Sequence, residues 1–248
     1  MYTVTTRTIG LWAAVLLASL TPLARAEDAG NRQPNTLTEQ EQKDGWKLLF
    51  DGKSTAGWRA FRGKEIPGVW SVVDGALVVS PKSRTRGGDI VTEGEYGNFE
   101  FAFDWKVSPG ANSGVMYRVS EEYNEPWMTG PEYQVLDNAK HADGRNPKTS
   151  AASCYALYAP SADKTKPVGE WNQARIVVNG NHVEHWLNGE KVVEYEFGSS
   201  DWTERVAKSK FKALPRFGKE HSGHIDLQFH GDQVAFRNIR IRVPGERK

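Results

Sequence analysis

Ionisable side chains gather between residues 113 and 141, where they lie between two runs typical of β-strands. Glu132, Asp137 and His141 could take up and release protons here, because carboxyl and imidazole groups are common general acids and bases. The same three side chains could instead hold a divalent cation, since oxygen and imidazole ligands suit Ca²⁺ or a transition metal. Their spacing matches no established metal-binding loop. We therefore expect no cofactor, and a cation such as Ca²⁺ is the alternative.

Alternation within the two strand-like runs predicts which side chains share a face. In residues 115–119 the polar face carries Arg118, and in residues 132–137 it carries Glu132 and Gln134. If the apolar faces lie on the core, these three polar residues form one surface of the sheet. The alternative is that Arg118 and Glu132 form only a cross-strand ion pair on a solvated face.

Large aromatic residues accompany these polar groups. The loop that links the two runs contains Tyr123, Trp127 and Met128. These large apolar side chains are not expected to be exposed to water unless they bind a ligand or cover the core. We expect Trp127 and Tyr155 to contact a ligand, with a lid over the core as the alternative for Trp127. The nine tryptophans and eight tyrosines of the chain are compatible with a β-sheet core, and in exported β proteins such residues also stack on sugar rings.

The first 26 residues have the features of a cleavable signal peptide. A short apolar run, residues 9–20, is followed by Ala24-Arg25-Ala26, an ending that suits signal peptidase. The run is too short for a stable membrane anchor, and no later segment approaches 20 consecutive apolar residues. We expect a periplasmic or secreted protein without a membrane anchor, and a polar tether over residues 27–44.

Composition excludes several classes of protein. Lysine and arginine total 32 against 31 acidic residues, and a near-neutral surface argues against nucleic acid as the main partner. Cys154 is the single cysteine, so no intrachain disulfide can hold the fold. The chain also lacks a glycine-rich phosphate loop, a Cys-x-x-Cys pair and a Gly-x-Ser-x-Gly elbow.

Strand patterns after residue 45 predict a single all-β domain, residues 45–248. Asp74-Gly75 between two apolar runs predicts a hairpin with a type I′ turn, because both turn residues accept positive φ. No helix separates the strands for parallel crossovers, so the pattern indicates an antiparallel sandwich. Asp201 and Glu204 resemble a capping box and predict one short helix over residues 201–209. Further strands are expected at 99–107, 153–158, 171–178, 182–187, 191–197, 224–230 and 234–243.

Several motifs, in order from about residue 45 to 244, resemble the 3-keto-disaccharide hydrolase family, formerly a domain of unknown function. The resemblance implies a concanavalin A-like jelly roll whose concave face binds sugar, and cleavage of a glycoside already oxidised at C3. It places the family's polar positions on Arg118, Glu132, Gln134, Asp137, His141, Gln228 and His230. The motifs are LFDGKS with GW (49–54, 57–58), SGVMYR (113–118), GPEYQVLD (130–137), GEWN (169–172), WLNG (186–189) and GHIDLQFHG (223–231).

A ketone at C3 acidifies the proton on C2, so such a site needs a base, a donor that stabilises the enolate and an acid for the leaving oxygen. We expect Glu132 or His141 to be the base, Arg118 to be the enolate stabiliser and His230 or Asp137 to be the acid. Alternatively, Asp137 only shapes the turn that ends its strand, and His230 only caps a hairpin.

The expected function is therefore cleavage of 3-keto glycosides by an exported enzyme, through hydrolysis or through elimination followed by hydration. The expected ligand is a carbohydrate, and an oxidoreductase would supply the keto sugar. A lectin-like module without catalysis is the rival, because many sandwiches of this shape only bind glycans. An ordinary glycosidase is less favoured, since the Glu-x-Asp-x-x-Glu motif of jelly-roll glucanases is absent.

Overall fold

The computed structural model describes residues 33–80 and 88–245. The expected signal peptide lies outside these residues, as does the start of the expected tether. Within the described ranges, no helix combines the length and the apolar character needed to cross a membrane.

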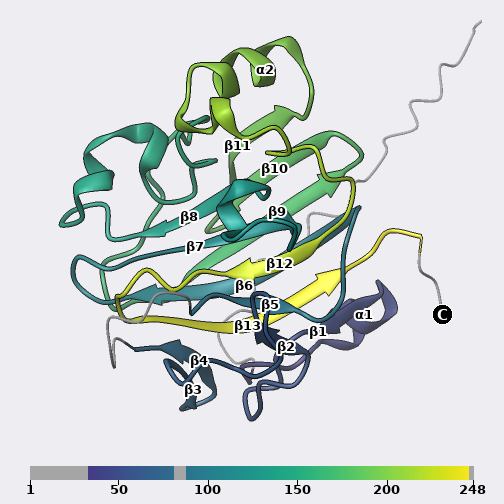
Figure 1. Ribbon diagram of the computed structural model, residues 1–248. Helices are drawn as coiled ribbons and strands as arrows, with labels where there is room; N and C mark the ends of the chain where they lie inside the picture. The colour runs from purple at the N-terminus through teal and green to yellow at the C-terminus, as the bar shows by residue number, and fades with distance from the viewer. Residues whose placement is uncertain (1–32, 81–87, 246–248) are drawn as a thin grey trace, which may run out of the picture. The chain divides into compact units, whose positions relative to one another are not determined.

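Two antiparallel sheets pack face to face in the jelly-roll sandwich that the sequence predicted (Figure 1). The larger sheet has the strand order β11-β10-β9-β6-β13-β4-β3, with β1 paired to β13, and the smaller has the order β2-β5-β12-β7-β8. The bounds are β1 Trp46–Leu48, β2 Trp58–Ala60, β3 Trp70–Val73, β4 Ala76–Val79, β5 Ile90–Thr92, β6 Phe99–Val107, β7 Asn112–Val119, β8 Glu132–Leu136, β9 Asn172–Asn179, β10 His182–Leu187, β11 Glu190–Glu196, β12 His224–Leu227 and β13 Val234–Arg242.

Aromatic residues fill the space between the sheets. The alternation predicted for β6 sends Phe99 and Phe103 inward, where they meet aromatic rings of the smaller sheet. The ring centroids of Phe99 and Tyr117 are 6.4 Å apart, and those of Phe103 and Tyr133 are 5.6 Å apart. Both pairs of rings meet edge to face. This packing fixes the inward faces of β7 and β8, so the alternate residues of both strands point away from the core.

The Asn-Gly and Asp-Gly turns adopt the predicted conformation. Asp74 and Gly75 have φ values of 50° and 72°, which is the pair of positive angles that a type I′ turn requires. Asn188 and Gly189, between β10 and β11, have φ values of 50° and 87°. The predicted hairpin β3–β4 is therefore confirmed, and the expected strands β9, β10 and β11 form an antiparallel meander.

The polar segment expected to be a tether is instead held against the larger sheet from residue 33 onward. The Asn35 backbone N–H donates to Asn238 Oδ1 at 2.6 Å, and Asn35 Oδ1 accepts from the Asn238 backbone N–H at 2.8 Å. Helix α1, Glu39–Lys43, then begins at a capping box formed by Thr38 and Glu41. Hydrogen bonding to the sheet thus orders a segment that has no apolar periodicity.

The predicted late helix is found as α2, Ser200–Ala207, but its cap differs from the prediction. Ser199 is the N-cap, and its hydroxyl accepts from the Trp202 backbone N–H. Four short 3-10 helices also occur in the described ranges: η2 Pro126–Met128, η3 Ala142–Arg145, η4 Pro147–Thr149 and η5 Lys210–Ala213.

Residues 153–158 do not form the predicted strand. Cys154 makes only isolated bridges, one to Tyr133 and one to Tyr158, within a chain of turns. Cys154 and Leu157, which are three residues apart, are both buried, and this is not the period of two that a strand shows.

Candidate active site

A row of outward-facing residues crosses the smaller sheet, and it ends at Glu132. The strand registers pair Arg59 with Val91, Val91 with Asp226, Asp226 with Met116, and Met116 with Glu132. These residues alternate with core residues along their strands, so they lie on the face opposite the other sheet. The row places two carboxylic acids, Glu132 and Asp226, on strands that both flank β7.

The Glu132 carboxyl is buried without a protein partner. The residue is 8% exposed, and neither carboxyl oxygen accepts a hydrogen bond from a described residue. Burial raises the pKa of Glu132 to about 8. The positive charge of Lys210 opposes this rise, and the negative charges of Asp89 and Asp143 add to it. A group that titrates this close to neutrality is suited to proton transfer.

Lys210 brings an amine to the same place from the start of η5. Its Nζ lies over three aromatic rings, 4.3 Å from the centroid of Tyr155, 5.2 Å from Phe211 and 5.6 Å from Trp127. No described residue forms a hydrogen bond or an ion pair with this amine. Lys210 as a whole is exposed, but burial around its amine lowers the pKa of that amine. The negative charges of Glu132 and Asp143 act in the opposite direction and raise it.

Two histidines, His141 and His230, lie near Glu132 and Lys210, and Asp143 links His141 to Tyr155. The Tyr155 hydroxyl donates to Asp143 Oδ2 at 3.2 Å, and the Asp143 backbone N–H donates to His141 Nδ1 at 3.1 Å. His141 thereby caps η3 and has Nε2 left to donate when the ring is neutral. The rings of His141 and His230 lie 6.3 Å apart, nearly perpendicular. Glu132, Tyr155, Trp127, His141 and His230 are thus brought together, as the sequence predicted.

Two further acids lie near Glu132. Asp226 is fully buried, and neither of its carboxyl oxygens has a hydrogen-bond partner in residues 33–80 and 88–245. Asp89 accepts from the Phe229 backbone N–H at 2.7 Å, and burial raises its pKa to about 7. Burial also raises the pKa of Asp226 well above its usual range, and the charges of Asp89 and Glu132 add to the effect. Mutual repulsion therefore favours the protonated forms of these acids.

Gln228, one of the polar positions that the family resemblance indicated, follows directly after β12. Its side-chain Oε1 is buried without a partner, while its backbone carbonyl accepts from the Ser113 hydroxyl at 2.8 Å. The position next to Asp226 keeps Gln228 at the edge of the candidate site.

Arg118 does not join Glu132, which corrects the expected role of this residue. Its guanidinium donates to the backbone carbonyls of Gly97 and Gly180, at 2.9 and 2.8 Å, and stacks on Phe197. Arg118 lies at a bulge of β7 with φ of 53°, and this conformation turns its side chain away from the row. The proposed enolate stabiliser is therefore a structural residue.

Asp137 and Gln134 are also held in structural contacts. Asp137 accepts from the backbone N–H groups of Gly110 and Ala139, at 2.7 and 2.9 Å, so the alternative interpretation of this residue as a turn former is the correct one. Gln134 is fully buried, and its amide donates to the Thr149 carbonyl at 3.2 Å. Neither side chain is free to serve as a proton donor or a substrate contact.

The ligand atoms of Glu132, Asp137 and His141 do not form a cation site in the described part of the chain. There, the group of acidic and imidazole side chains with ligand atoms within 4.8 Å of one another is His182, Glu184 and Glu194, on β10 and β11. Lys191 already pairs with Glu184 at 3.1 Å and with Glu194 at 2.7 Å, which balances the negative charge of this group.

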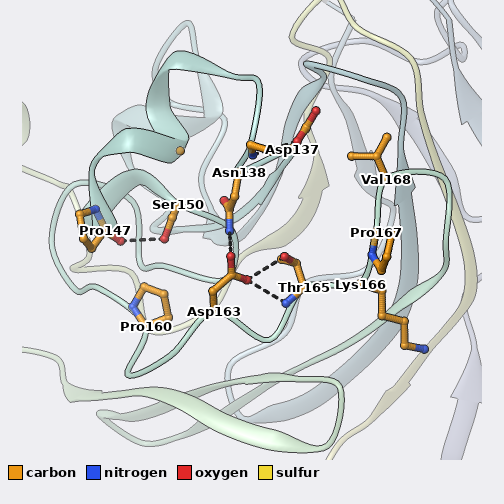
Figure 2. A pocket seen from close by; sticks show the side chains of 12 residues that line it. Asp137, Asn138, Pro147, Ser150, Pro160, Asp163, Thr165, Lys166, Pro167 and Val168 are labelled. Atoms are coloured by element: carbon orange, nitrogen blue, oxygen red, sulfur yellow. Dashed lines mark hydrogen bonds between the residues drawn. The ribbon is translucent and has the colours of Figure 1, made fainter.

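Figure 2 shows a hollow of about 600 Å³, and neither Glu132 nor Lys210 is among the residues that line it. Two loop segments, residues 137–150 and 160–168, form its walls. Asp163 joins them by accepting from the Asn138 amide at 3.0 Å and from Thr165 at 2.7 Å. The Ser150 hydroxyl donates to the Pro147 carbonyl at 2.9 Å in the same wall. None of Arg118, Glu132 and His141 lines this hollow.

Sequence reasoning missed Lys210 and the catalytic potential of the acids Asp89, Asp143 and Asp226. Lys210 is one of several lysines in the polar stretch after α2, and no local pattern separates it from Lys208 or Lys212. Asp226 was detectable, since it alternates with Ile225 and Leu227 on a strand whose outer face was expected to be polar.

Comparisons with known proteins identify relatives of the chain. Residues 45–242 match the family described as 3-keto-alpha-glucoside-1,2-lyase-like domain. A 3-keto-disaccharide hydrolase of Bacteroides thetaiotaomicron is 36% identical over 228 aligned residues, which cover 81% of this chain and 79% of the relative. A crystal structure of a proposed glycosyl hydrolase from Parabacteroides distasonis is 37% identical, with a TM-score of 0.79, and the match covers 85% of this chain and 99% of that one. A second from the same organism is 29% identical, with a TM-score of 0.64 and coverage of 80% and 98%.

Proposed function

Because this chain belongs to the 3-keto-alpha-glucoside-1,2-lyase-like domain family, we propose that it cleaves the glycosidic bond of sugars that carry a ketone at C3. The observation that carries this proposal is the unpartnered Glu132 carboxyl, with a pKa near neutrality, in reach of the Lys210 charge. A 3-keto-disaccharide hydrolase with 36% identity supports the same substrate class.

The proposed reaction begins at C2. The ketone acidifies the C2 proton, Glu132 removes it, and the electron pair moves toward the C3 oxygen. The bond from C1 to the leaving oxygen then breaks, and a proton from His141 or His230 neutralises that oxygen. Water adds to C1 of the unsaturated ketone and completes a net hydrolysis. Lys210 stabilises the enolate, which is the role that the sequence suggested for Arg118. Its positive charge acts on Glu132 and is therefore close to the place where the enolate forms.

Elimination and direct hydrolysis differ in one observable intermediate. Elimination yields an α,β-unsaturated ketone, which absorbs in the near ultraviolet. Elimination also exchanges the C2 proton of the sugar with solvent. Transient absorbance during turnover and deuterium at C2 in D₂O support elimination. Turnover without either signal supports a direct displacement at C1.

The rival function is a glycan-binding module without catalysis. Trp127 and Tyr155 next to a sheet surface suit such a role, because aromatic faces pack on sugar rings. Incubation with matched native and 3-keto disaccharides separates the functions. Cleavage of the keto sugar alone supports the proposal, cleavage of neither supports the lectin, and cleavage of the native sugar supports an ordinary glycosidase.

We also propose that the protein is exported and acts downstream of an oxidoreductase. The apolar run and the Ala24-Arg25-Ala26 ending favour cleavage after Ala26, and a 3-keto sugar must arise by oxidation of a C3 hydroxyl. N-terminal sequencing of protein from the periplasm or medium tests export. A mature chain that starts at Glu27 is expected, and a full-length chain retained in the cytoplasm would contradict it.

A further inference from the structure

Among the residues that the structure describes, none forms a hydrogen bond or an ion pair with the Lys210 amine, which lies over the rings of Tyr155, Phe211 and Trp127. Ser209 caps η5 by accepting from the Phe211 backbone N–H at 3.0 Å, and the Phe211 ring stacks on Phe217 with 3.9 Å between centroids. These contacts hold the base of the Lys210 side chain. Its Nζ then lies 4.3 Å from the centroid of the Tyr155 ring, close enough to Glu132 and Asp143 for their charges to act on it.

A primary amine that no described residue binds through a hydrogen bond or an ion pair can attack a ketone, and a carboxyl group whose charge acts on that amine can take up the proton that the reaction releases. We propose that Lys210 forms a covalent iminium with the C3 ketone of the substrate, and that Glu132 removes the C2 proton from this adduct. The inference rests on the proposed function, which supplies the ketone. Burial around Nζ lowers the pKa of Lys210, which increases the fraction of neutral, nucleophilic amine.

The proposed steps balance without any further reactant than water. The amine attacks C3, and loss of one water gives the iminium. Glu132 takes the C2 proton, and the electron pair forms an enamine between C2 and C3. The enamine then expels the leaving oxygen from C1, and this oxygen takes a proton. One water adds at C1 and returns a proton to C2, and a second water hydrolyses the iminium to release the ketone and the free lysine.

The neighbouring lysines Lys208 and Lys212 serve as matched controls, because the aromatic rings that surround the Lys210 amine do not surround theirs. Lys208 pairs with Glu204 on α2. Lys212 lies on η5 itself, two residues after Lys210, and is exposed. A general reactivity of surface lysines would therefore label Lys212 as readily as Lys210.

Reductive trapping tests the inference on the intact protein. The protein is incubated with methyl 3-keto-α- and 3-keto-β-glucopyranoside and sodium cyanoborohydride, and adducts are mapped by peptide mass spectrometry. We expect one adduct, on Lys210. It should add the mass of the keto sugar less one oxygen atom, and it should lack the methoxy group where elimination precedes reduction. The unoxidised methyl glucosides, which have no carbonyl group, should give none. Lys210→Arg keeps the charge but cannot form an imine, and it should lower kcat/KM by more than about a thousandfold while Lys212→Arg leaves it unchanged.

The outcomes separate this inference from the proposed function. Cleavage of the keto sugar without an adduct, together with Lys210→Arg activity within about tenfold of the wild type, overturns the iminium and leaves the function standing. An adduct spread equally over Lys210 and Lys212 also overturns it. No cleavage and no adduct with either anomer overturns both. An adduct confined to Lys210 without cleavage supports the iminium and contradicts the cleavage.

Discussion

The Glu132 side chain lies directly over Gly114 of the neighbouring strand: a Cβ added at Gly114 would come within 2.1 Å of Glu132 Oε1 and 2.8 Å of its Cγ and Cδ. Gly114 has no positive φ, so its lack of a side chain matters for space and not for backbone conformation. The absence of a side chain at one strand position thus determines where the proton-transfer group of the next strand can lie.

Replacing Gly114 by alanine should displace the Glu132 carboxyl and lower kcat on a 3-keto glycoside by about a hundredfold, because small misplacements of reacting groups are costly. Steady-state kinetics measures this. Gly68→Ala is the matched control, since nothing lies within 4 Å of its added Cβ. Equal kcat values for the two variants would show that the position of Glu132 is unimportant.

The titration of Glu132 should also govern stability. Burial raises its pKa from 4.5 to about 8, so between these values the folded protein holds a proton that the unfolded chain has released. Folding stability from this group is therefore present below pH 4.5 and is lost as the pH rises to 8. Glu132→Gln cannot ionise, and at pH 9 it should be more stable than the wild type by up to roughly 5 kcal/mol.

Urea unfolding at pH 4 and pH 9 measures this difference. The two proteins should have similar free energies of unfolding at pH 4 and should diverge at pH 9. A Glu132→Gln variant that is less stable than the wild type at pH 9 would mean that the carboxylate is stabilised by a partner.

The strands and turns could be predicted because they depend on local rules. Alternation in β6, Asp74-Gly75 and Asn188-Gly189 each specify their own conformation. The strand expected at residues 153–158 was wrong, because this stretch forms turns with isolated bridges to Tyr133 and Tyr158 and not a ladder with a neighbouring strand. The helix cap was misplaced by two residues because Ser199 and Asp201 are both suitable N-caps.

The candidate site could be predicted only in part, because its residues meet through tertiary structure. Glu132 and His141 were found from their place in one dense segment of sequence. Arg118 was misassigned because a bulge with positive φ, which alternation cannot show, turns its side chain toward Gly97 and Gly180. Lys210 was missed because it reaches Glu132 from a segment far along the chain.

Arg118 should matter for stability and not for catalysis. Arg118→Ala leaves the Gly97 and Gly180 carbonyls without this donor, so we expect a loss of about 2–3 kcal/mol in the free energy of unfolding. The kcat of the folded variant should stay within about threefold of the wild type. A large loss of kcat without a loss of stability would restore the catalytic role first considered for this arginine.

Trp127 should contribute to substrate affinity. Its ring lies beside Lys210, and it is only partly buried. Trp127→Ala should raise KM for the keto sugar about tenfold, the equivalent of roughly 1.4 kcal/mol, with little change in kcat. Thermal unfolding is the control: a fall in melting temperature with unchanged KM would identify Trp127 as a lid over the core.

The central claim is tested most directly by the cleavage of matched native and 3-keto disaccharides by the wild type and by Glu132→Gln. We predict that the wild type cleaves only the keto sugar, and that the variant folds but loses activity on it by more than about a thousandfold. Equal activity of the two proteins on the keto sugar, or cleavage of the native disaccharide alone, would contradict the account.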